Sequence, residues 1–260
     1  MCIIFFAHQI HAKYPFLLAA NRDEYYNRPS APAHFWPDFP AILAGRDLGQ
    51  NGTWLGVTRT GRFAALTNYR DPAAYRADAL SRGHLVSRFL QENTEPMRYL
   101  EDVQDNVHAY NGFNLLAGDF YSGELWYYGN RENQIRKLAP GIYGLSNHLL
   151  DTPWPKVTRG KSFFTEAISA GDRQMTDLLW ALLQDRTAGQ EDQLPDTGVS
   201  HEWERTLSPI HIHSPAYGTR AMTLLQLQQN GVMQFEEQSF DEEKQNWAHV
   251  KFTISLQQPK

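Results

Sequence analysis

The only cysteine in the sequence is Cys2, which follows the initiator methionine and precedes the apolar run IIFFA. If the methionine is removed, Cys2 carries both a thiol and a free α-amino group. That amine has a reference pKa of about 7.7–8.0, so part of it is neutral at cellular pH and can accept the thiol proton. Residue type and position thus indicate a nucleophile that supplies its own base. The alternative is a small buried apolar residue at the start of a strand.

A polar cluster ends the second apolar run of the sequence, LLAANRDEYYNRP. If the first two runs form a hairpin, this cluster lies beside Cys2. Asp23 is then placed to accept a hydrogen bond from the α-ammonium group, and Arg22 to favour the thiolate. Asn21 and Glu24 are candidate binding residues in the same cluster. The alternative is a charged turn after an edge strand.

Acyl transfer also requires hydrogen-bond donors for an oxyanion. Two asparagines close apolar strands at equivalent places, Asn68 in FAALTNYRD and Asn147 in GIYGLSNH, and are candidates for this role. Asparagine is also common at strand ends for purely local reasons. Trp54, at the start of a predicted strand, and His148, next to Asn147, are further candidate binding residues.

A last candidate is Arg220, which follows Gly218 in SPAYGTRAMTLL and leads an apolar strand. An arginine in this place is suited to bind a carboxylate or to brace an active thiol, and a surface arginine is the alternative. In IHIHS, His211 and His213 are expected on one side of a strand. No third ligand accompanies them, so the sequence predicts no metal site.

The elements that must position these residues follow from the hydrophobic pattern. IIFFAH and PFLLAAN predict a hairpin, and two further strands are predicted over 54–58 and 62–67. Helices are predicted in the middle of the chain, with stripes formed by Leu80, Leu85, Phe89 and Leu90 and by Met97, Leu100, Val103 and Val107.

Strands resume with GFNLLAGDF, GELWYYGN and GIYGLSNH. Two helices, KVTRGKSFFTEAIS and RQMTDLLWALLQDR, and a polar surface excursion follow. The strands IHIHS, RAMTLLQLQ, VMQFEEQSF and AHVKFTISL end the chain. This order favours a layered α+β fold with antiparallel sheets, in one domain spanning residues 1–260.

Composition narrows the class of protein. The 260 residues carry a net charge of −5 and no basic block, which argues against a nucleic-acid partner. No apolar stretch reaches the length of a membrane span, and no secretory signal is recognised. A single cysteine cannot form an internal disulfide, so we expect a reducing, cytoplasmic environment. The oligomeric state is not indicated.

The motifs MCI, AANRDE, TNYR, YGLSN and YGTR, in this order, resemble those of the NRDE family, also called the transport and Golgi organisation type two family. That family is similar to N-terminal nucleophile (Ntn) hydrolases of the choloylglycine hydrolase and penicillin V acylase group. The resemblance implies a four-layer αββα sandwich of antiparallel sheets. It also implies Cys2 as nucleophile, Asp23 as orienter of its amine, Asn68 and Asn147 as the oxyanion site and Arg220 as a bracing cation.

One position departs from the acylase pattern, which has an arginine where this sequence has Ala20. Residues 20 and 22 share a face of an extended strand, so Arg22 is a candidate replacement. The alternative is that the acylase machinery is incomplete in this chain.

Two functions remain open. The first is a thiol amidase that cleaves a linear non-peptide amide with an apolar acyl group. The second is a non-catalytic carrier or trafficking factor for a small hydrophobic metabolite such as haem, with His8, His11, His34 or His148 as iron ligands. The aromatic clusters HFWPDFP, GELWYYG and TPWPK suit an apolar ligand in either case. No other cofactor is expected.

Overall fold

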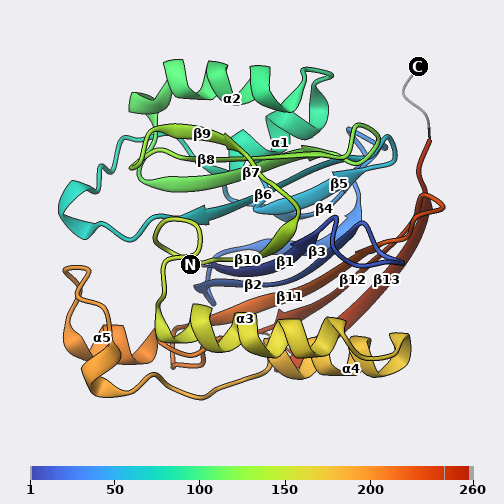
Figure 1. Cartoon of the computed structure of the whole chain (residues 1–260). Helices are drawn as coiled ribbons and strands as arrows, with labels where there is room; N and C mark the ends of the chain where they lie inside the picture. The colour runs from blue at the N-terminus through green and yellow to red at the C-terminus, as the bar shows by residue number, and fades with distance from the viewer. Residues whose placement is uncertain (1, 243, 258–260) are drawn as a thin grey trace.

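Two antiparallel sheets pack face to face between two pairs of helices (Figure 1). The computed structural model describes residues 2–242 and 244–257. Alternating apolar residues give each sheet two faces to bury, and the second sheet and a helix pair cover them. The four layers confirm the predicted αββα sandwich of the α+β class.

The first sheet has six strands in the order β10-β1-β2-β11-β12-β13. The strands β1 and β2 form the predicted hairpin, and β11 lies against the other side of β2. The strands are β1 (Cys2–His8), β2 (Phe16–Tyr25), β10 (Gly141–Leu145), β11 (Tyr217–Leu227), β12 (Val232–Asp241) and β13 (Asn246–Ser255).

The second sheet has seven strands in sequence order, a simple meander in which each strand pairs with the next. Its strands are β3 (Ser30–Phe35), β4 (Ile42–Asp47), β5 (Leu55–Thr58), β6 (Arg62–Asn68), β7 (Phe113–Asp119), β8 (Glu124–Gly129) and β9 (Gln134–Lys137).

Two helices cover each sheet from outside. The seven-stranded sheet is covered by α1 (Gly83–Gln91) and α2 (Pro96–Asp105), and the six-stranded sheet by α3 (Pro155–Ile168) and α4 (Asp172–Leu183). Shorter helical segments lie in the connections: η1 (Pro72–Ala74), η2 (Val107–Ala109), η3 (Glu191–Gln193) and α5 (His201–Thr206).

The alternation of side chains in β1 determines where the thiol points. Ile4 and Phe6 pack between the two sheets, whereas Ile3 and Phe5 pack against the α3 and α4 layer. Each such fully buried side chain stabilises the fold by about 1.5–3 kcal/mol. By the same two-residue period, the side chain of Cys2 lies on the face between the sheets.

Three sequence predictions need correction. Leu80 is not part of a helical stripe, because α1 begins at Gly83 and the Leu80 side chain is 54% exposed. Met97 lies within α2 but is 45% exposed, and Tyr99 is buried in its place. IHIHS forms no strand.

The histidines of IHIHS therefore do not share a strand face. His211 is buried and His213 is exposed. Separately, no helix in the described part of the chain has the length and apolar character needed to cross a bilayer.

Candidate active site

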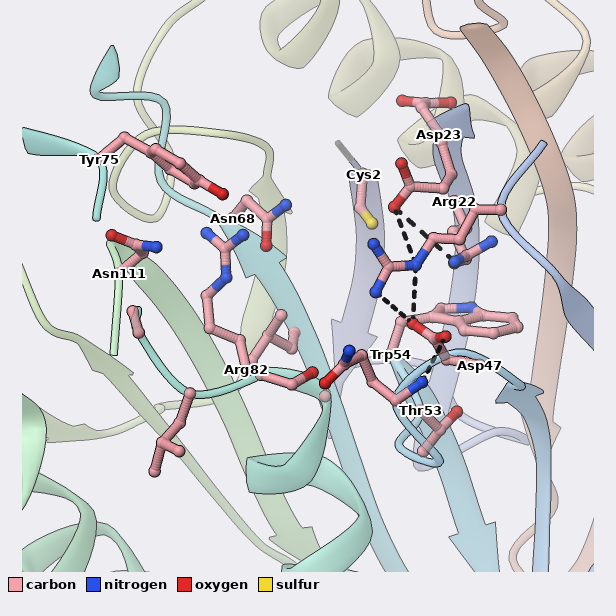
Figure 2. Close-up of a pocket in the computed structure, with 18 of the residues that line it drawn as sticks. Cys2, Arg22, Asp23, Asp47, Thr53, Trp54, Asn68, Tyr75, Arg82 and Asn111 are labelled. Atoms are coloured by element: carbon pink, nitrogen blue, oxygen red, sulfur yellow. Dashed lines mark hydrogen bonds and ion pairs between the residues drawn. The ribbon is translucent and has the colours of Figure 1, made fainter. Parts of the chain in front are cut away.

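A cavity of about 260 Å³ opens between the two sheets, at the start of β1 and the ends of β2 and β6. Figure 2 shows Cys2, Arg22, Asp23, Trp54 and Asp47 on one side of it and Asn68, Arg82, Tyr75 and Asn111 on the other. The described residues that line it are Cys2, Arg22, Asp23, Glu24, Arg28, Asp47, Gln50, Thr53, Trp54, Leu66, Asn68, Tyr75, Arg76, Ala77, Ala79, Leu80, Ser81, Arg82, Gly83 and Asn111.

Cys2 is the first residue of β1 and pairs directly with Arg22 of β2. Only 9% of the residue is exposed, and it lines the cavity. Burial raises the pKa of the Cys2 thiol, while the Arg22 guanidinium and a backbone hydrogen bond from Asp23 oppose that rise. The thiol is thus accessible from the cavity but stays protonated unless a base acts on it.

Asp23 is the next residue of β2, so its side chain leaves the opposite face of the strand from Arg22. Its Oδ1 accepts a hydrogen bond of 2.7 Å from Oγ1 of Thr219, the residue paired with it on β11. Burial raises the pKa of the Asp23 carboxyl, and the Lys156 ammonium counteracts this. This placement puts the carboxyl on the helix-facing side of the sheet, near the backbone that begins β1.

Lys156 is a further cation buried on that helix-facing side, and it is not among the site residues predicted from sequence. It belongs to the first turn of α3, and its Nζ donates to the carbonyl oxygen of Leu207 at 2.9 Å. Burial lowers the pKa of Lys156 to about 8, opposed mainly by Asp23. A usable signal existed, because Lys156 falls in the buried stripe of α3 together with Gly160 and Phe164.

A buried ion pair lies close to Lys156. Arg70 binds Glu204 through its Nη1, and both side chains are at most 5% exposed. The Arg70 guanidinium also stacks over the ring of Trp154, 4.8 Å from its centroid. Glu204 lies in α5, so this pair ties the long polar excursion to the site.

Asn68 and Asn147 are adjacent but do not occupy equivalent positions. Asn68 ends β6 and lines the cavity, opposite Cys2. Asn147 is fully buried and does not line it. Its Nδ2 donates instead to the backbone carbonyl oxygen of Asn68 at 2.9 Å. Ser146 links the group to the nucleophile strand, because its Oγ donates to the carbonyl oxygen of Cys2 at 3.2 Å.

Arg22 packs on Trp54, with the guanidinium carbon 4.4 Å from the ring centroid. Room for the indole comes from Gly45, since a Cβ there would lie 2.2 Å from Cη2 of Trp54. Ala20 is buried in the core between the sheets, and Arg22 lines the cavity on the same strand face. This geometry matches the expectation that residues 20 and 22 share a face.

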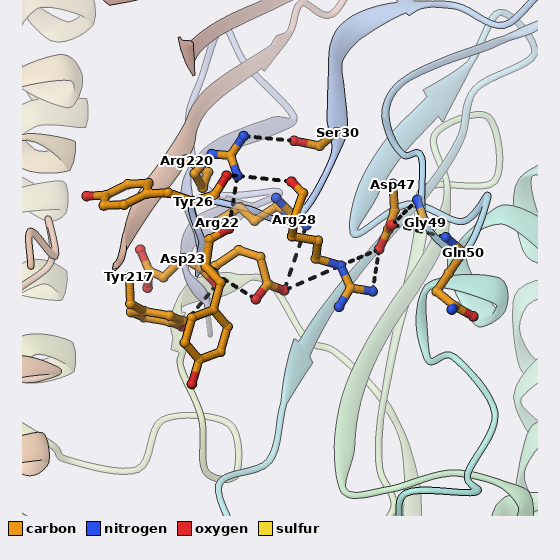
Figure 3. A network of polar contacts seen from close by, with 12 residues as sticks. Arg22, Asp23, Tyr26, Arg28, Ser30, Asp47, Gly49, Gln50, Tyr217 and Arg220 are labelled. Carbon is orange, nitrogen blue, oxygen red and sulfur yellow. Dashed lines mark hydrogen bonds and ion pairs between the residues drawn. The ribbon is translucent and has the colours of Figure 1, made fainter. Parts of the chain in front are cut away.

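Arg220 does not line the cavity that contains Cys2. Its Nη1 donates to the carbonyl oxygens of Tyr25, Tyr26 and Arg28, at 3.0, 2.7 and 3.1 Å. Figure 3 shows Arg220 reaching from β11 to the turn after β2. The expected brace for the thiol is therefore a clamp on this turn.

The other two residues of the NRDE motif have different environments. Nδ2 of Asn21 donates to the carbonyl oxygens of Leu183 and Ile210, at 2.8 and 2.9 Å, outside the cavity. Glu24 does line the cavity, with its Oε2 3.9 Å from Arg22 and 3.8 Å from Arg28. Asn21 therefore fastens β2 to its neighbours, whereas Glu24 contributes charge to the cavity wall.

The histidines considered as iron ligands lie outside the described lining of the cavity. His148 is engaged at both ring nitrogens, Nε2 with the Tyr69 hydroxyl at 2.7 Å and Nδ1 with Thr152 Oγ1 at 2.8 Å. His8 lies at the far end of β1 from Cys2. None of the four histidines considered as iron ligands is among the described residues that line the cavity, namely His8, His11, His34 and His148. Within residues 2–242 and 244–257, no group of three His, Cys, Asp or Glu side chains is arranged to hold a metal ion.

Four of the aromatic side chains in the clusters noted in the sequence are buried, whereas Phe39 is exposed. Trp36, Tyr127 and Tyr128 are fully buried, and Trp154 is 9% exposed. The aromatic residues among the described lining of the cavity are Trp54 and Tyr75. The cavity is therefore mainly polar, not the aromatic cleft that the clusters suggested.

The far wall of the cavity is formed by the connection between β6 and α1, which sequence reasoning missed. Asn111 holds this connection, because its Oδ1 accepts from the Arg76 backbone N–H and its Nδ2 donates to the Arg76 carbonyl oxygen, both at 2.8 Å. Arg82 is anchored by a hydrogen bond of 2.9 Å from its Nη1 to the carbonyl oxygen of Gly112. The segment carries no periodic pattern that would have indicated its role.

The fold is that of the Ntn hydrolases. The whole chain aligns with 99% of the conjugated bile acid hydrolase of Clostridium perfringens, crystallised as its C2A mutant, with a TM-score of 0.51 and 10% sequence identity. At this identity the similarity establishes the fold alone.

Within that fold class, the chain belongs to the Transport and Golgi organisation 2 family, whose model matches residues 1–242. It is 39% identical to the Transport and Golgi organization 2 homolog of Mus musculus, over 99% of this chain and 100% of the relative. The identity to the Transport and Golgi organization protein 2 homolog of Homo sapiens is also 39%, with the same coverage. The family resemblance inferred from the NRDE and neighbouring motifs is confirmed.

Proposed function

We propose that this protein is an N-terminal thiol hydrolase that cleaves the carbon–nitrogen bond of a linear, non-peptide amide. The observation that carries the proposal is the position of Cys2, whose thiol lines a polar cavity with Arg22 beside it and Asn68 across from it. The C2A mutant of the bile acid hydrolase shares this fold, and its mutated position corresponds in number to Cys2.

The reaction begins once removal of the initiator methionine frees the α-amine of Cys2. Because burial raises the pKa of the thiol, a base is required, and the amine takes the thiol proton. The buried carboxylate of Asp23 orients and stabilises the resulting ammonium group. Lys156 limits the free-energy cost of keeping that carboxylate charged in the interior.

The thiolate then attacks the amide carbonyl carbon, forming a C–S bond while the carbonyl π electrons move to oxygen. Asn68 donates a hydrogen bond to this oxyanion, and Asn147 holds Asn68 in place through its backbone. Collapse of the intermediate breaks the C–N bond, and the α-ammonium protonates the leaving amine. Water next attacks the thioester, which releases the carboxylic acid and restores the thiol.

A second cavity offers a place for an apolar acyl group. It has a volume of about 390 Å³ and shares Arg22, Arg28 and Trp54 with the first. Leu48 and Phe240 are among the apolar side chains that line it. The acyl chain would extend past Trp54 into this space while its carbonyl remains at Cys2.

The test is expression of the full chain, followed by intact mass measurement to establish that Met1 has been removed. N-acyl amides are then screened for hydrolysis by the wild type and by Cys2→Ala. We expect turnover by the wild type and none by the variant. Equal turnover by both proteins would reject Cys2 as nucleophile.

The carrier alternative makes a different prediction. If the chain is a haem carrier, titrating haem into micromolar protein should shift the Soret band. In that case neither the wild type nor Cys2→Ala should hydrolyse amides. We expect no such shift, because the histidines considered for iron lie away from the cavity. Since a reactive thiol must remain reduced, we also propose a reducing compartment such as the cytoplasm.

A further inference from the structure

The arginines of the cavity outnumber the carboxylates that face them. Four arginines are among its described lining residues: Arg22, Arg28, Arg76 and Arg82. The carboxylates that face these arginines are those of Glu24 and Asp47. The Asp23 carboxylate points instead to the helix layer, where it binds Thr219. The cavity therefore has an excess of positive charge around the thiol.

Two of these arginines already have partners. Arg28 forms a close ion pair with Asp47, with Nη2 and Nε at 2.7 and 2.8 Å from Oδ2 (Figure 3). The Nη2 of Arg76 donates to the carbonyl oxygen of His108 at 2.5 Å. The charge of Arg28 is therefore balanced by a carboxylate, and Arg76 is exposed to solvent, which screens its charge.

Arg22 differs because its charge is incompletely satisfied. It is 6% exposed, and within the described part of the chain its buried Nη1 has no hydrogen-bond partner. The nearest carboxylate oxygen, on Glu24, is 3.9 Å from its Nη2. A buried guanidinium nitrogen without an acceptor is costly, so this is a site where an anionic ligand group gains a strong hydrogen bond.

Arg82 approaches from the opposite wall. Its side chain is anchored by Gly112, and it forms no ion pair with the described residues. Figure 2 shows its guanidinium directed toward Asn68, across the cavity from Arg22. Burial lowers the pKa of Arg82, which means that its charge is not fully compensated by its surroundings. An anion between the two walls would compensate both arginines.

We propose that the substrate carries a carboxylate or phosphate group that binds between Arg22 and Arg82, beside the Cys2 thiol. Both groups present paired oxygens that suit the planar guanidinium. That the bound anion belongs to an amide substrate rests on the proposed function. The anion site itself can be measured without any turnover.

The test uses the single cysteine of the chain as a reporter. Iodoacetate and iodoacetamide both alkylate a thiolate with loss of iodide, but iodoacetate carries a carboxylate and iodoacetamide is neutral. Their rate ratio at Cys2, followed by intact mass, cancels the thiolate fraction because the same thiolate attacks both reagents. Free cysteine gives the reference ratio.

We expect the iodoacetate-to-iodoacetamide ratio at Cys2 to exceed that of free cysteine by about tenfold, as two incompletely compensated guanidinium groups in the cavity would produce. Arg82→Gln should lower the ratio several-fold. Arg98→Gln, at an exposed arginine on α2, should leave it unchanged. A ratio equal to that of free cysteine in the wild type would overturn the proposal.

Protection experiments separate the two anion types. Inorganic phosphate or acetate is added at matched ionic strength, and alkylation by iodoacetamide is timed. Protection by phosphate indicates a phosphate-bearing substrate, and protection by acetate a carboxylate-bearing one. If Cys2→Ala retains full amidase activity while the elevated ratio stands, the proposed function fails and the anion site remains. If Cys2→Ala loses amidase activity while the wild-type ratio equals that of free cysteine, the proposed function stands and the anion site fails.

Discussion

Cys2 and Arg22 lie directly opposite each other in the antiparallel pairing of β1 and β2, so the thiol and the guanidinium share one face of the sheet. Arg22 is held there by its stacking on Trp54. The register of a single hairpin thus decides which cation lies beside the nucleophile. The side chain of Asp23, one residue further along β2, faces the opposite side of the sheet and lies near the backbone at the start of β1.

Replacing Arg22 should therefore shift the pH at which the thiol becomes reactive. The guanidinium lowers the pKa of the Cys2 thiol against the larger, raising effect of burial. In Arg22→Gln that opposition is lost, so the midpoint of the pH–rate profile for alkylation by iodoacetamide should move to higher pH. Arg98→Gln should leave the midpoint in place. A shift to lower pH in Arg22→Gln would contradict the described electrostatics.

The two asparagines should separate into a catalytic and a positioning role. Asn68 lines the cavity, so Asn68→Ala should lower kcat by about 10²–10³ through loss of an oxyanion donor, with little change in Tm. Asn147→Ala removes the donor to the Asn68 carbonyl oxygen and should destabilise the protein by about 1–3 kcal/mol. Denaturant titration and steady-state kinetics on both variants measure the split. Equal kinetic losses with equal stability would show that both amides contact the oxyanion.

The hairpin and the strand-end residues could be predicted from sequence because strand alternation is a local signal. That signal placed Cys2 near the NRDE cluster and Asn68 at a strand end. The same alternation, applied to residues 22 and 23, would also have separated Arg22 from Asp23 onto opposite faces. Arg220 could not be placed in this way, because a register shift between Thr219 and Ala221 interrupts the pairing of β11 with β2.

Other parts of the site left no local trace. Arg82 and Tyr75 belong to an aperiodic connection, and its path depends on Asn111, far away in the sequence. The aromatic clusters were misinterpreted because composition does not distinguish core from cavity: Trp36 is fully buried, whereas Trp54 lines the cavity. Only the packed structure separates the two cases.

The contact between Gly45 and Trp54 should be sensitive to one added methyl group. A Cβ at position 45 would lie 2.2 Å from the indole, so Gly45→Ala must displace Trp54. We expect a loss of about 1–3 kcal/mol from overpacking, measured by denaturant unfolding. In a Trp54→Ala background the same substitution should cost much less. Additive effects in this double-mutant cycle would mean that Trp54 is not the residue displaced.

Lys156 should give the protein an unusual pH dependence of stability. Its pKa is lowered by burial from 10.5 to about 8, so between these pH values the unfolded chain binds the proton more tightly than the folded one. The free energy of unfolding contributed by this group therefore rises with pH over that interval, by about 3 kcal/mol in total. Below pH 8 the group is charged in both states, and the full cost of burying the charge remains.

The matched comparison is Lys156→Met against Lys161→Met. Lys161 belongs to the same helix but not to its buried residues, and its Nζ donates to Asp151 Oδ1 at 2.7 Å. Without the Lys156 cation, the already raised pKa of Asp23 rises further, so this carboxyl loses stability over a wider interval as pH increases from its usual pKa to the raised one. The shifted titration of Lys156 lies between about pH 8 and 10.5, so the wild type should gain stability relative to Lys156→Met in denaturant titrations from pH 7 to 10. Lys161→Met should follow the wild-type curve. Parallel curves for the wild type and Lys156→Met would show that Lys156 keeps an ordinary pKa.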